Sequence, residues 1–290
     1  MASRDFGEVS ERLRRSTVQV SGERSRPGNG SGVIWTADGV IITNAHVARG
    51  DRARVELWDG REFDAELTSR DARRDLAALR IPERDLPAAI AGDSSALRPG
   101  ELVLAVGNPL GFIGALTTGV VHALGPMRGI GRLPWVQAAV RLAPGNSGGP
   151  LANARGQVIG VNTMIAGGRG SISGGLALAI PSNAVADFLR RGVNRPALGV
   201  TVRPVPLDDR ESIALMVLEV APHGPGAAAS ILIGDLLLAA NGKRFRDVDD
   251  LADAIDTAAG RVLTLQFARG DHRKTREVVV RFEAGSAEAA

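Results

Sequence analysis

Residues 145–150 have the sequence GNSGGP, in which a single serine lies between small residues. Glycine has no Cβ, so it reaches backbone angles closed to other residues and lets a ligand approach the main chain. A serine that attacks a carbonyl group needs such surroundings, because its Oγ must be exposed and nearby N–H groups must point at the oxyanion that forms. We predict an oxyanion hole at Gly145, Asn146 and Ser147, with the N–H groups of Gly145 and Ser147 as donors. Taken alone, the stretch also fits an ordinary turn, since these are the usual turn residues.

A serine nucleophile needs a base, and the chain has four histidines. Three have ordinary explanations: His122 on an expected strand, His223 in a Pro/Gly-rich loop and His272 in a polar turn. His46 differs, because it follows the apolar run 40–42 and precedes the break at Gly50. A residue at the end of a strand can be held rigidly and still face a cleft. We therefore predict that His46 is the base.

The acid that orients the base is harder to choose, because Asp is common in this chain. Asp75 lies immediately before the apolar segment 76–81, which would be anchored in the core. A carboxylate in that position can be partly buried and accept a hydrogen bond from His46 Nδ1–H. Asp71 is the competitor, and its arginine neighbours suggest an exposed turn with solvated charges. We predict that Asp75 is the acid.

The order His46, Asp75, Ser147 resembles that of the chymotrypsin-like serine proteases, and the local sequences are closer to the HtrA/Deg branch. The motifs that carry this resemblance are GSGVI at 30–34, TNAHV at 43–47, DLA at 75–77, GNP at 107–109, GNSGGPL at 145–151 and AIPSN at 179–183. Three ordered catalytic motifs are more specific than one, which weakens the explanation of Ser147 as a turn residue alone. The resemblance implies a mainly β fold with two six-stranded β-barrels. His46 and Asp75 would come from the first barrel and Ser147 from the second.

The pattern of short strands agrees with that fold. Regular short strands separated by Gly-rich turns favour a closed barrel, because closure removes exposed edges. The expected strands are 17–20, 32–35, 40–43, 53–57, 62–67, 77–81, 102–106, 117–123, 136–139, 157–163 and 176–180. A short helix is expected at 184–191, after the start signal at 181–183.

A second domain is expected after the helix. We predict a protease domain at 1–192, a linker at 193–195, a PDZ domain at 196–284 and a tail at 285–290. Strands are expected at 198–202, 214–220, 235–239, 262–268 and 276–282. Asp247 is expected to cap a helix whose apolar face carries Val248, Leu251 and Ile255. This arrangement resembles a PDZ domain of the HtrA type, which is an α+β, partly open barrel.

A PDZ domain binds an extended peptide as an extra strand and holds its C-terminal carboxylate with backbone N–H groups. The resemblance assigns this role to Leu198, Gly199 and Val200, with Leu251 and Ile255 on the facing helix. Ala197 departs from the family, which usually has an aromatic residue there. The alternative is that these side chains only form the core.

The resemblance implies an endopeptidase that hydrolyses misfolded or unfolded proteins through an acyl-enzyme. Arg141, Leu142, Ala143 and Asn162 are assigned to its specificity pocket. Arg141 replaces the Asp that a protease for basic residues carries, so basic residues are disfavoured and small aliphatic ones are expected. An inward Arg141 would admit acidic residues, whereas an outward Arg141 would be a charge on the rim.

The amino-acid composition argues against several other classes of function. The chain has 290 residues, no cysteine and a net charge of +3, with arginines interleaved among acids, so no nucleic-acid partner is expected. Residues 28–32 are glycine-rich but precede a strand, which does not suit a phosphate loop. No cofactor, no metal site and no membrane span are predicted. The N-terminus lacks a signal sequence, so the protein is cytoplasmic, or extracytoplasmic if a leader has been removed.

Two further expectations come from the resemblance. The family usually forms homotrimers, so an oligomer is expected here. The alternative function is a PDZ-dominated, peptide-binding chaperone or scaffold with weak or no proteolysis. Covalent labelling of Ser147 by a fluorophosphonate discriminates between the two functions.

Overall fold

The structure is a computed structural model that describes residues 6–22, 30–126, 132–163, 176–191, 198–207, 212–258, 262–270 and 274–282. The chain divides into two compact units, each with its own internal contacts. The first unit comprises Met1–Met127 and Leu133–Val193, and the second comprises Arg128–Arg132 and Asn194–Ala290. The linker expected at 193–195 lies outside the described residues.

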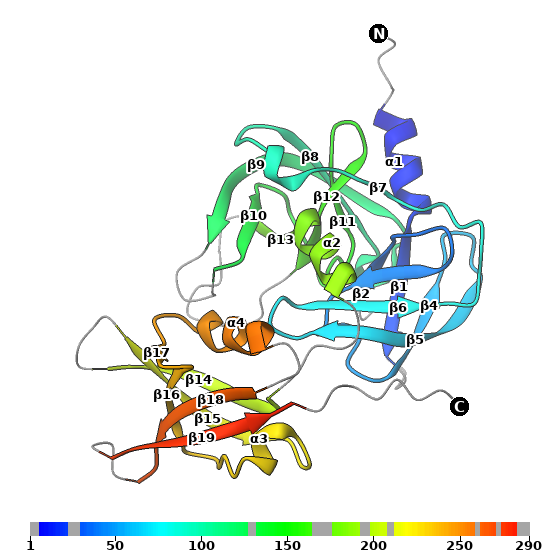
Figure 1. Cartoon of the computed structure of the whole chain (residues 1–290). Helices are drawn as coiled ribbons and strands as arrows, with labels where there is room; N and C mark the ends of the chain where they lie inside the picture. Colours follow the sequence, from blue (N-terminus) through cyan, green and yellow to red (C-terminus); the bar gives the residue numbers. More distant parts are fainter. Residues whose placement is uncertain are drawn as a thin grey trace. The chain divides into compact units, whose positions relative to one another are not determined.

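The first unit begins with a closed antiparallel barrel (Figure 1). Its strand order is β1-β2-β3-β6-β5-β4. Apolar side chains from alternate positions fill the interior, including Val18, Val20, Ile41, Val55 and Leu79. The strands are β1 (Thr17–Gly22), β2 (Gly30–Ile34), β3 (Val40–Thr43), β4 (Arg52–Glu56), β5 (Glu62–Asp71) and β6 (Leu76–Arg80).

A second six-stranded barrel completes this unit. Its strands follow the order β11-β8-β9-β10-β13-β12, and pairing of β11 with β12 closes the ring. A short strand, β7 (Ile90–Ala91), adds to β12 in parallel. The strands are β8 (Leu102–Gly107), β9 (Ala115–Pro126), β10 (Pro134–Ala138), β11 (Pro150–Asn153), β12 (Gln157–Thr163) and β13 (Ala177–Pro181). The expected double barrel of chymotrypsin-like type is confirmed.

Two apolar clusters join the barrels to each other. One combines Ile42 and Leu76 of the first barrel with Trp135 and Val161 of the second. Helix α2 (Ser182–Arg191), which was expected from the sequence, packs Val185 and Phe188 into this cluster. Burial of these side chains fixes one barrel against the other, which matters because the predicted site draws residues from both.

The second cluster contains a helix that the strand pattern did not predict. Helix α1 (Phe6–Arg15) buries Val9 and Leu13 against Val33 of β2 and Leu104 of β8. Its apolar residues recur three and four positions apart, which is the spacing of one helical face. Two short 3₁₀ turns, η1 (Ser94–Ala96) and η2 (Pro109–Gly111), complete the unit.

The second unit is a sheet with two helices. Its strand order is β14-β15-β16-β18-β19, and β17 pairs with β16. Phe245, Leu251, Leu263 and Leu265 lie in its core. The elements are β14 (Val200–Pro206), β15 (Ile213–Val220), α3 (Pro225–Ala228), β16 (Leu236–Ala240), β17 (Lys243–Arg244), α4 (Asp249–Ala258), β18 (Val262–Ala268) and β19 (Thr275–Arg281). Among the helices of the described residues, none has the length and apolar character needed to cross a membrane.

Candidate active site

His46 and Asp75 are brought together by the pairing of β3 with β6. Thr43, the last residue of β3, pairs with Ala77, so the segment after β3 lies beside the residue before β6. His46 Nδ1 lies 2.8 Å from Asp75 Oδ2 and 3.0 Å from Oδ1. The backbone N–H of His46 also donates to Asp75 Oδ1, at 3.0 Å. The carboxylate therefore fixes both the position of the histidine and the tautomer with a proton on Nδ1.

The backbone at Asp75 turns sharply to aim this carboxylate. Its φ is +55°, in the left-handed region that Asp tolerates better than most residues. The side-chain amide of Asn44 donates to the Asp75 carbonyl oxygen at 3.0 Å and holds the turn. The side chains of His46 and Asp75 are 39% and 23% exposed, so the pair lies at the surface of the fold and is open to a substrate.

Thr163 is a functional candidate that the sequence did not reveal. It is the last residue of β12 in the second barrel, and its Oγ1–H donates to Asp75 Oδ2 at 2.8 Å. Thr163 is buried, and the carboxylate that it contacts is partly exposed. Asp75 thus accepts hydrogen bonds from both barrels. Nothing in the local sequence of β12 indicates this contact, because it joins residues 88 positions apart.

Asp71 is not the solvated residue that its arginine neighbours suggested. It is buried at the end of β5, and its Oδ1 accepts the N–H groups of Arg73 and Arg74 at 3.1 Å. The guanidinium of Arg74 also pairs with Oδ2 at 3.3 Å. Asp71 therefore closes the turn between β5 and β6. The expectation of an exposed turn was wrong because backbone N–H groups, and not water, solvate this carboxylate.

The segment that contains Ser147 begins with a tight turn. Asn146 N–H donates to the Ala143 carbonyl at 3.0 Å, Pro144 occupies the second position, and Gly145 has φ +105°. A bond from the fourth residue to the first, with proline second and positive φ third, defines a type II turn. A Cβ on Gly145 would lie 2.7 Å from the Asn108 carbonyl oxygen, so only glycine fits.

Ser147 lies against β2 of the first barrel. Its carbonyl oxygen accepts the Ser31 N–H at 2.8 Å. The next residue, Gly148, has φ +89°, and a Cβ there would overlap the Ser31 carbonyl and the Thr43 hydroxyl. Thr43 is three residues before His46. Contacts with β2 and β3 thus place the Ser147 segment at the end of the first barrel that carries His46 and Asp75.

The residues assigned to the specificity pocket have different surroundings. Asn162 is fully buried, and its amide donates to the Pro150 carbonyl at 2.9 Å, so it supports the strand after Ser147. Leu142 packs partly into the core of the second barrel. Arg141 is exposed, which fits a charge on the rim of the pocket. The Ala143 carbonyl accepts the Asn146 N–H and so closes the turn at residues 143–146. A role for these four residues in specificity stays a prediction.

The predicted PDZ residues divide into buried and partly buried ones. Leu198 and Leu251 belong to the core, with Leu198 accepting the Gly226 N–H at 2.8 Å through its carbonyl. Gly199 has φ +72°, which explains a glycine before β14. Val200 and Ile255 pack against the core from positions that are only half-buried. The contacts fit both explanations given for these residues, so their role in peptide binding stays a prediction.

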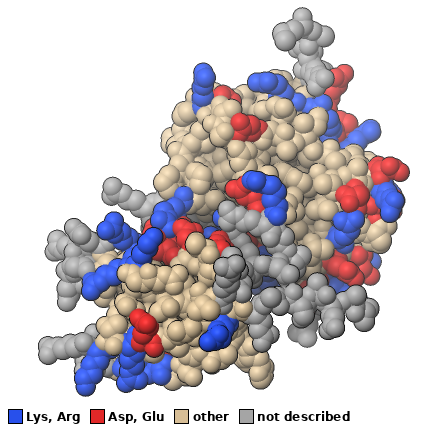
Figure 2. Space-filling view, viewed as in Figure 1, with Lys and Arg blue, Asp and Glu red and all other residues tan. Residues whose placement is uncertain are grey.

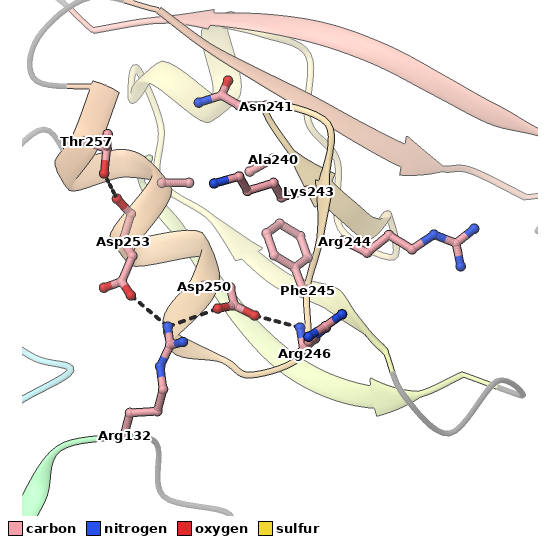
Figure 3. Close-up of a pocket in the computed structure, with 11 residues that line it drawn as sticks. Arg132, Ala240, Asn241, Lys243, Arg244, Phe245, Arg246, Asp250, Asp253 and Thr257 are labelled. Carbon is pink, nitrogen blue, oxygen red and sulfur yellow. Dashed lines mark hydrogen bonds and ion pairs between the residues drawn. The ribbon is translucent and has the colours of Figure 1, made fainter.

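The second unit contains a cavity of about 620 Å³ between the β16–β17 hairpin and α4 (Figure 3). Arg132, which groups with this unit, bonds Asp250 at 2.9 Å and Asp253 at 2.7 Å along one side of it. The lining residues are Arg132, Ala240, Asn241, Lys243, Arg244, Phe245, Arg246, Asp250, Asp253, Ala254 and Thr257. None of them belongs to the predicted triad. On the face that Figure 2 shows, basic and acidic side chains lie close to one another at several places.

Two closed antiparallel barrels that carry His, Asp and Ser in this order are the architecture of the chymotrypsin-like serine peptidases. Residues 30–161 match the family model of the trypsin-like peptidase domain, and residues 216–269 match that of the PDZ domain. The chain thus carries a trypsin-like peptidase domain followed by a PDZ domain, and the relatives and solved structures that it resembles are DegP-like and HtrA-type serine proteases.

Curated relatives and solved structures agree with this family. The chain is 36% identical over 275 residues to a probable periplasmic serine endoprotease DegP-like of Pseudomonas putida, covering 89% of this chain and 57% of the relative. It is 38% identical over 280 residues to the protein of the same description from Brucella suis, covering 88% of this chain and 54% of the relative. The chain thus spans a little over half the length of these relatives.

Solved structures cover almost the whole chain. The HtrA-type protease AlgW with decapeptide has a TM-score of 0.65 and 28% identity, over 96% of this chain and 98% of that one. The serine endoprotease from Yersinia pestis has a TM-score of 0.65 and 26% identity, over 98% and 99%.

Proposed function

We propose that this chain is a serine endopeptidase in which Ser147 is the nucleophile, His46 the general base and Asp75 the group that orients His46. The observation that carries the proposal is the paired contact of Asp75 with the Nδ1 and the backbone N–H of His46. A carboxylate bound in this way occupies Nδ1 and leaves Nε2 of the imidazole to take the proton of the nucleophile. The glycine-shaped segment around Ser147 supports the same function, because it leaves room for a substrate backbone.

The reaction proceeds in two halves. Ser147 Oγ attacks the scissile carbonyl carbon while His46 Nε2 takes the hydroxyl proton, and His46 then gives that proton to the leaving amine. Water enters and His46 activates it in the same way, which releases the acyl group and regenerates Ser147. Asp75 stays ionised throughout and stabilises the imidazolium that forms in each half.

The N–H groups of Gly145 and Ser147 are proposed to bind the oxyanion, in a loop that Asn146 completes. Type I and type II turns differ by a flip of the central peptide, which in this turn carries the Gly145 N–H. The positive φ of Gly145 supports the type II form, in which that N–H is turned toward the attacked carbonyl. Such donors contribute on the order of a hundredfold to a thousandfold to the rate.

The proposed substrates are misfolded or unfolded proteins, with the PDZ domain binding peptide C-termini. The family of the chain and the peptide complex of AlgW support this class of ligand. We also propose a homo-oligomer. The competing function, a peptide-binding chaperone with little proteolysis, shares the PDZ domain but has no need for the His46–Asp75 pair.

The test compares the wild-type chain with Ser147→Ala and with Ser182→Ala as a matched control. Ser182 is also buried, and its hydroxyl donates to the Gly92 carbonyl at 2.7 Å in the same unit. We expect wild type and Ser182→Ala to cleave casein and to react with a fluorophosphonate, and Ser147→Ala to do neither while keeping its circular dichroism spectrum. Undiminished casein cleavage by Ser147→Ala would refute Ser147 as the nucleophile. A wild-type chain that does not react with the fluorophosphonate would favour the chaperone function.

A further inference from the structure

Ser31 of β2 lies where the first barrel meets the Ser147 segment. In the pairing of β2 with β3, Val33 faces Ile42, so Ser31 lies beyond Thr43, where β3 ends. On the side of β2 that faces β3, the N–H and C=O groups of Ser31 therefore have no strand to pair with. They are available to a segment from elsewhere in the chain, and Ser31 is fully buried, so each of its polar groups needs a partner within the protein.

The partners of Ser31 come from three separate segments. Its N–H donates to the Ser147 carbonyl at 2.8 Å, and its Oγ–H donates to the Gly145 carbonyl at 2.6 Å. Its own carbonyl oxygen accepts the Thr43 hydroxyl at 2.6 Å. The Asn108 N–H donates to Ser31 Oγ at 2.8 Å.

The bond from Asn108 gives the Ser31 hydroxyl its direction. A hydroxyl has one proton to donate and two lone pairs that accept. Because an N–H occupies one lone pair from the side of the second barrel, the proton is left to point at Gly145. A backbone group sets this direction, and Ser31 is fully buried, so solvent does not compete for its hydroxyl.

We propose that Ser31 is a positioning residue that holds the oxyanion-hole segment in its donor orientation. This inference rests on the proposed function of the Ser147 site. The two residues whose carbonyls Ser31 binds, Gly145 and Ser147, are the same two whose N–H groups are assigned to the oxyanion. Fixing these carbonyls fixes the planes of the 145–146 and 147–148 peptides, each of which adjoins a peptide that carries a proposed donor N–H. One side chain and one N–H of the first barrel thus restrain the segment on both sides of Asn146.

The expected consequence is specific to the transition state. Ser31 touches no substrate in this scheme, so removing its hydroxyl leaves ground-state binding intact. Oxyanion donors act on charge that exists only in the transition state, so loosening them lowers kcat with little change in KM. Ser31→Ala is also expected to bind a peptidyl boronate more weakly, because the tetrahedral boronate adduct places an oxygen where the oxyanion forms.

The experiment compares wild type, Ser31→Ala and the matched control Ser182→Ala in the full chain. We expect Ser31→Ala to lose about tenfold to a hundredfold in kcat and a similar factor in boronate affinity, with KM within about twofold. Fluorophosphonate labelling of Ser147 is expected to slow by a comparable factor. Ser182→Ala loses one buried serine hydroxyl as well, so it shows what a general loss of stability does to the same three measurements.

Three outcomes are decisive. An unreactive wild type refutes the proposed function and this inference with it. A reactive wild type together with unchanged kcat and boronate affinity in Ser31→Ala refutes the positioning role alone. If Ser31→Ala does not fold, Ser31→Cys replaces it, since a thiol fills the site but donates weakly. That variant must show the same selective loss of kcat, and wild-type kcat in it overturns the proposal.

Discussion

At the scale of single residues, Asp75 receives hydrogen bonds from both barrels of the first unit. His46 provides two of them from the first barrel and Thr163 provides one from the second. Hydrogen bonds to an ionised acceptor are stronger than those to a neutral one. Asp75 Oδ2 accepts both the Nδ1–H of His46 and the hydroxyl of the buried Thr163, so residues of both barrels restrain the carboxylate.

This contact predicts the effect of Thr163→Val, which removes the hydroxyl and keeps the shape of the side chain. We expect kcat for peptide hydrolysis to fall roughly tenfold, because Asp75 loses one of the donors that hold it against His46. Thr17→Val is the matched control, since the buried Thr17 hydroxyl donates to the Leu13 carbonyl at 2.7 Å. Equal kcat values for the two variants would show that Thr163 has no special role.

Residue roles differ in how far the sequence predicts them. The contact of Asp75 with His46 could be predicted, because an apolar strand directly follows Asp75. Ser31 and Thr163 could not, because each depends on a partner that is 114 or 88 positions away. Asp71 was misjudged for a local reason: charged neighbours suggested solvent, whereas the turn buries its carboxylate among N–H groups.

At the scale of elements, strands were easier to predict than the N-terminal helix. Alternation and turn residues marked most strands of both barrels. Helix α1 has only Phe6, Val9 and Leu13 as apolar positions among charged residues, and two of these bury their side chains. Packing against both barrels stabilises the helix more than its own propensity does, as is usual for short helices.

The packing of α1 gives a stability prediction. Leu13→Ala is expected to lower the free energy of unfolding by about 2–5 kcal/mol, since Leu13 is almost fully buried in a cluster drawn from both barrels. Phe6→Ala on the same helix is the control, because Phe6 is 49% exposed and should change stability by less than about 0.5 kcal/mol. Urea unfolding followed by tryptophan fluorescence measures both. Equal midpoints would contradict the docking of α1.

The start of α4 gives a pH prediction. Asp247 accepts the Asp249 N–H at 2.9 Å, and Asp250 accepts the N–H groups of Arg246 and Asp247 at 2.6 and 2.9 Å, which forms a reciprocal cap. Burial alone would raise the pKa of Asp250, but these two N–H groups and the charge of Arg132 together hold the pKa below its usual value of 3.8.

A carboxyl group whose pKa is lower in the folded state than in the unfolded state stabilises the fold at pH values above the unfolded-state pKa. That contribution is lost as the pH falls through the folded-state pKa. Asp250→Asn lacks this contribution at every pH. We therefore expect its deficit in urea midpoint relative to wild type to be largest near pH 6 and to shrink below pH 4. A deficit that stays constant down to pH 2 would argue against ionised Asp250 as the cap.

At the scale of the whole molecule, each unit has its own apolar core. The first has two barrels joined by clusters that include α1 and α2, and the second has a sheet with its own buried residues. Units that bury separate cores can fold separately. The boundaries at 192 and 196 are our proposal for where to divide the chain.

This division predicts that a fragment of residues 196–284 folds alone. We expect a cooperative urea transition and dispersed amide resonances, and we expect the full chain to unfold in two steps, one of which matches the fragment. A fragment that stays unfolded, or a full chain with a single transition by every probe, would show that the units depend on each other.

Because the site is divided between the barrels, the order of synthesis controls when activity can begin. A ribosome makes His46 and Asp75 first, but Ser147 and Thr163 belong to the second barrel, which closes only once β13 has emerged. Domains fold as units during translation. A nascent chain halted before Ala177 would therefore carry the proposed base and acid without the proposed nucleophile held in place, so we expect it to have no peptidase activity.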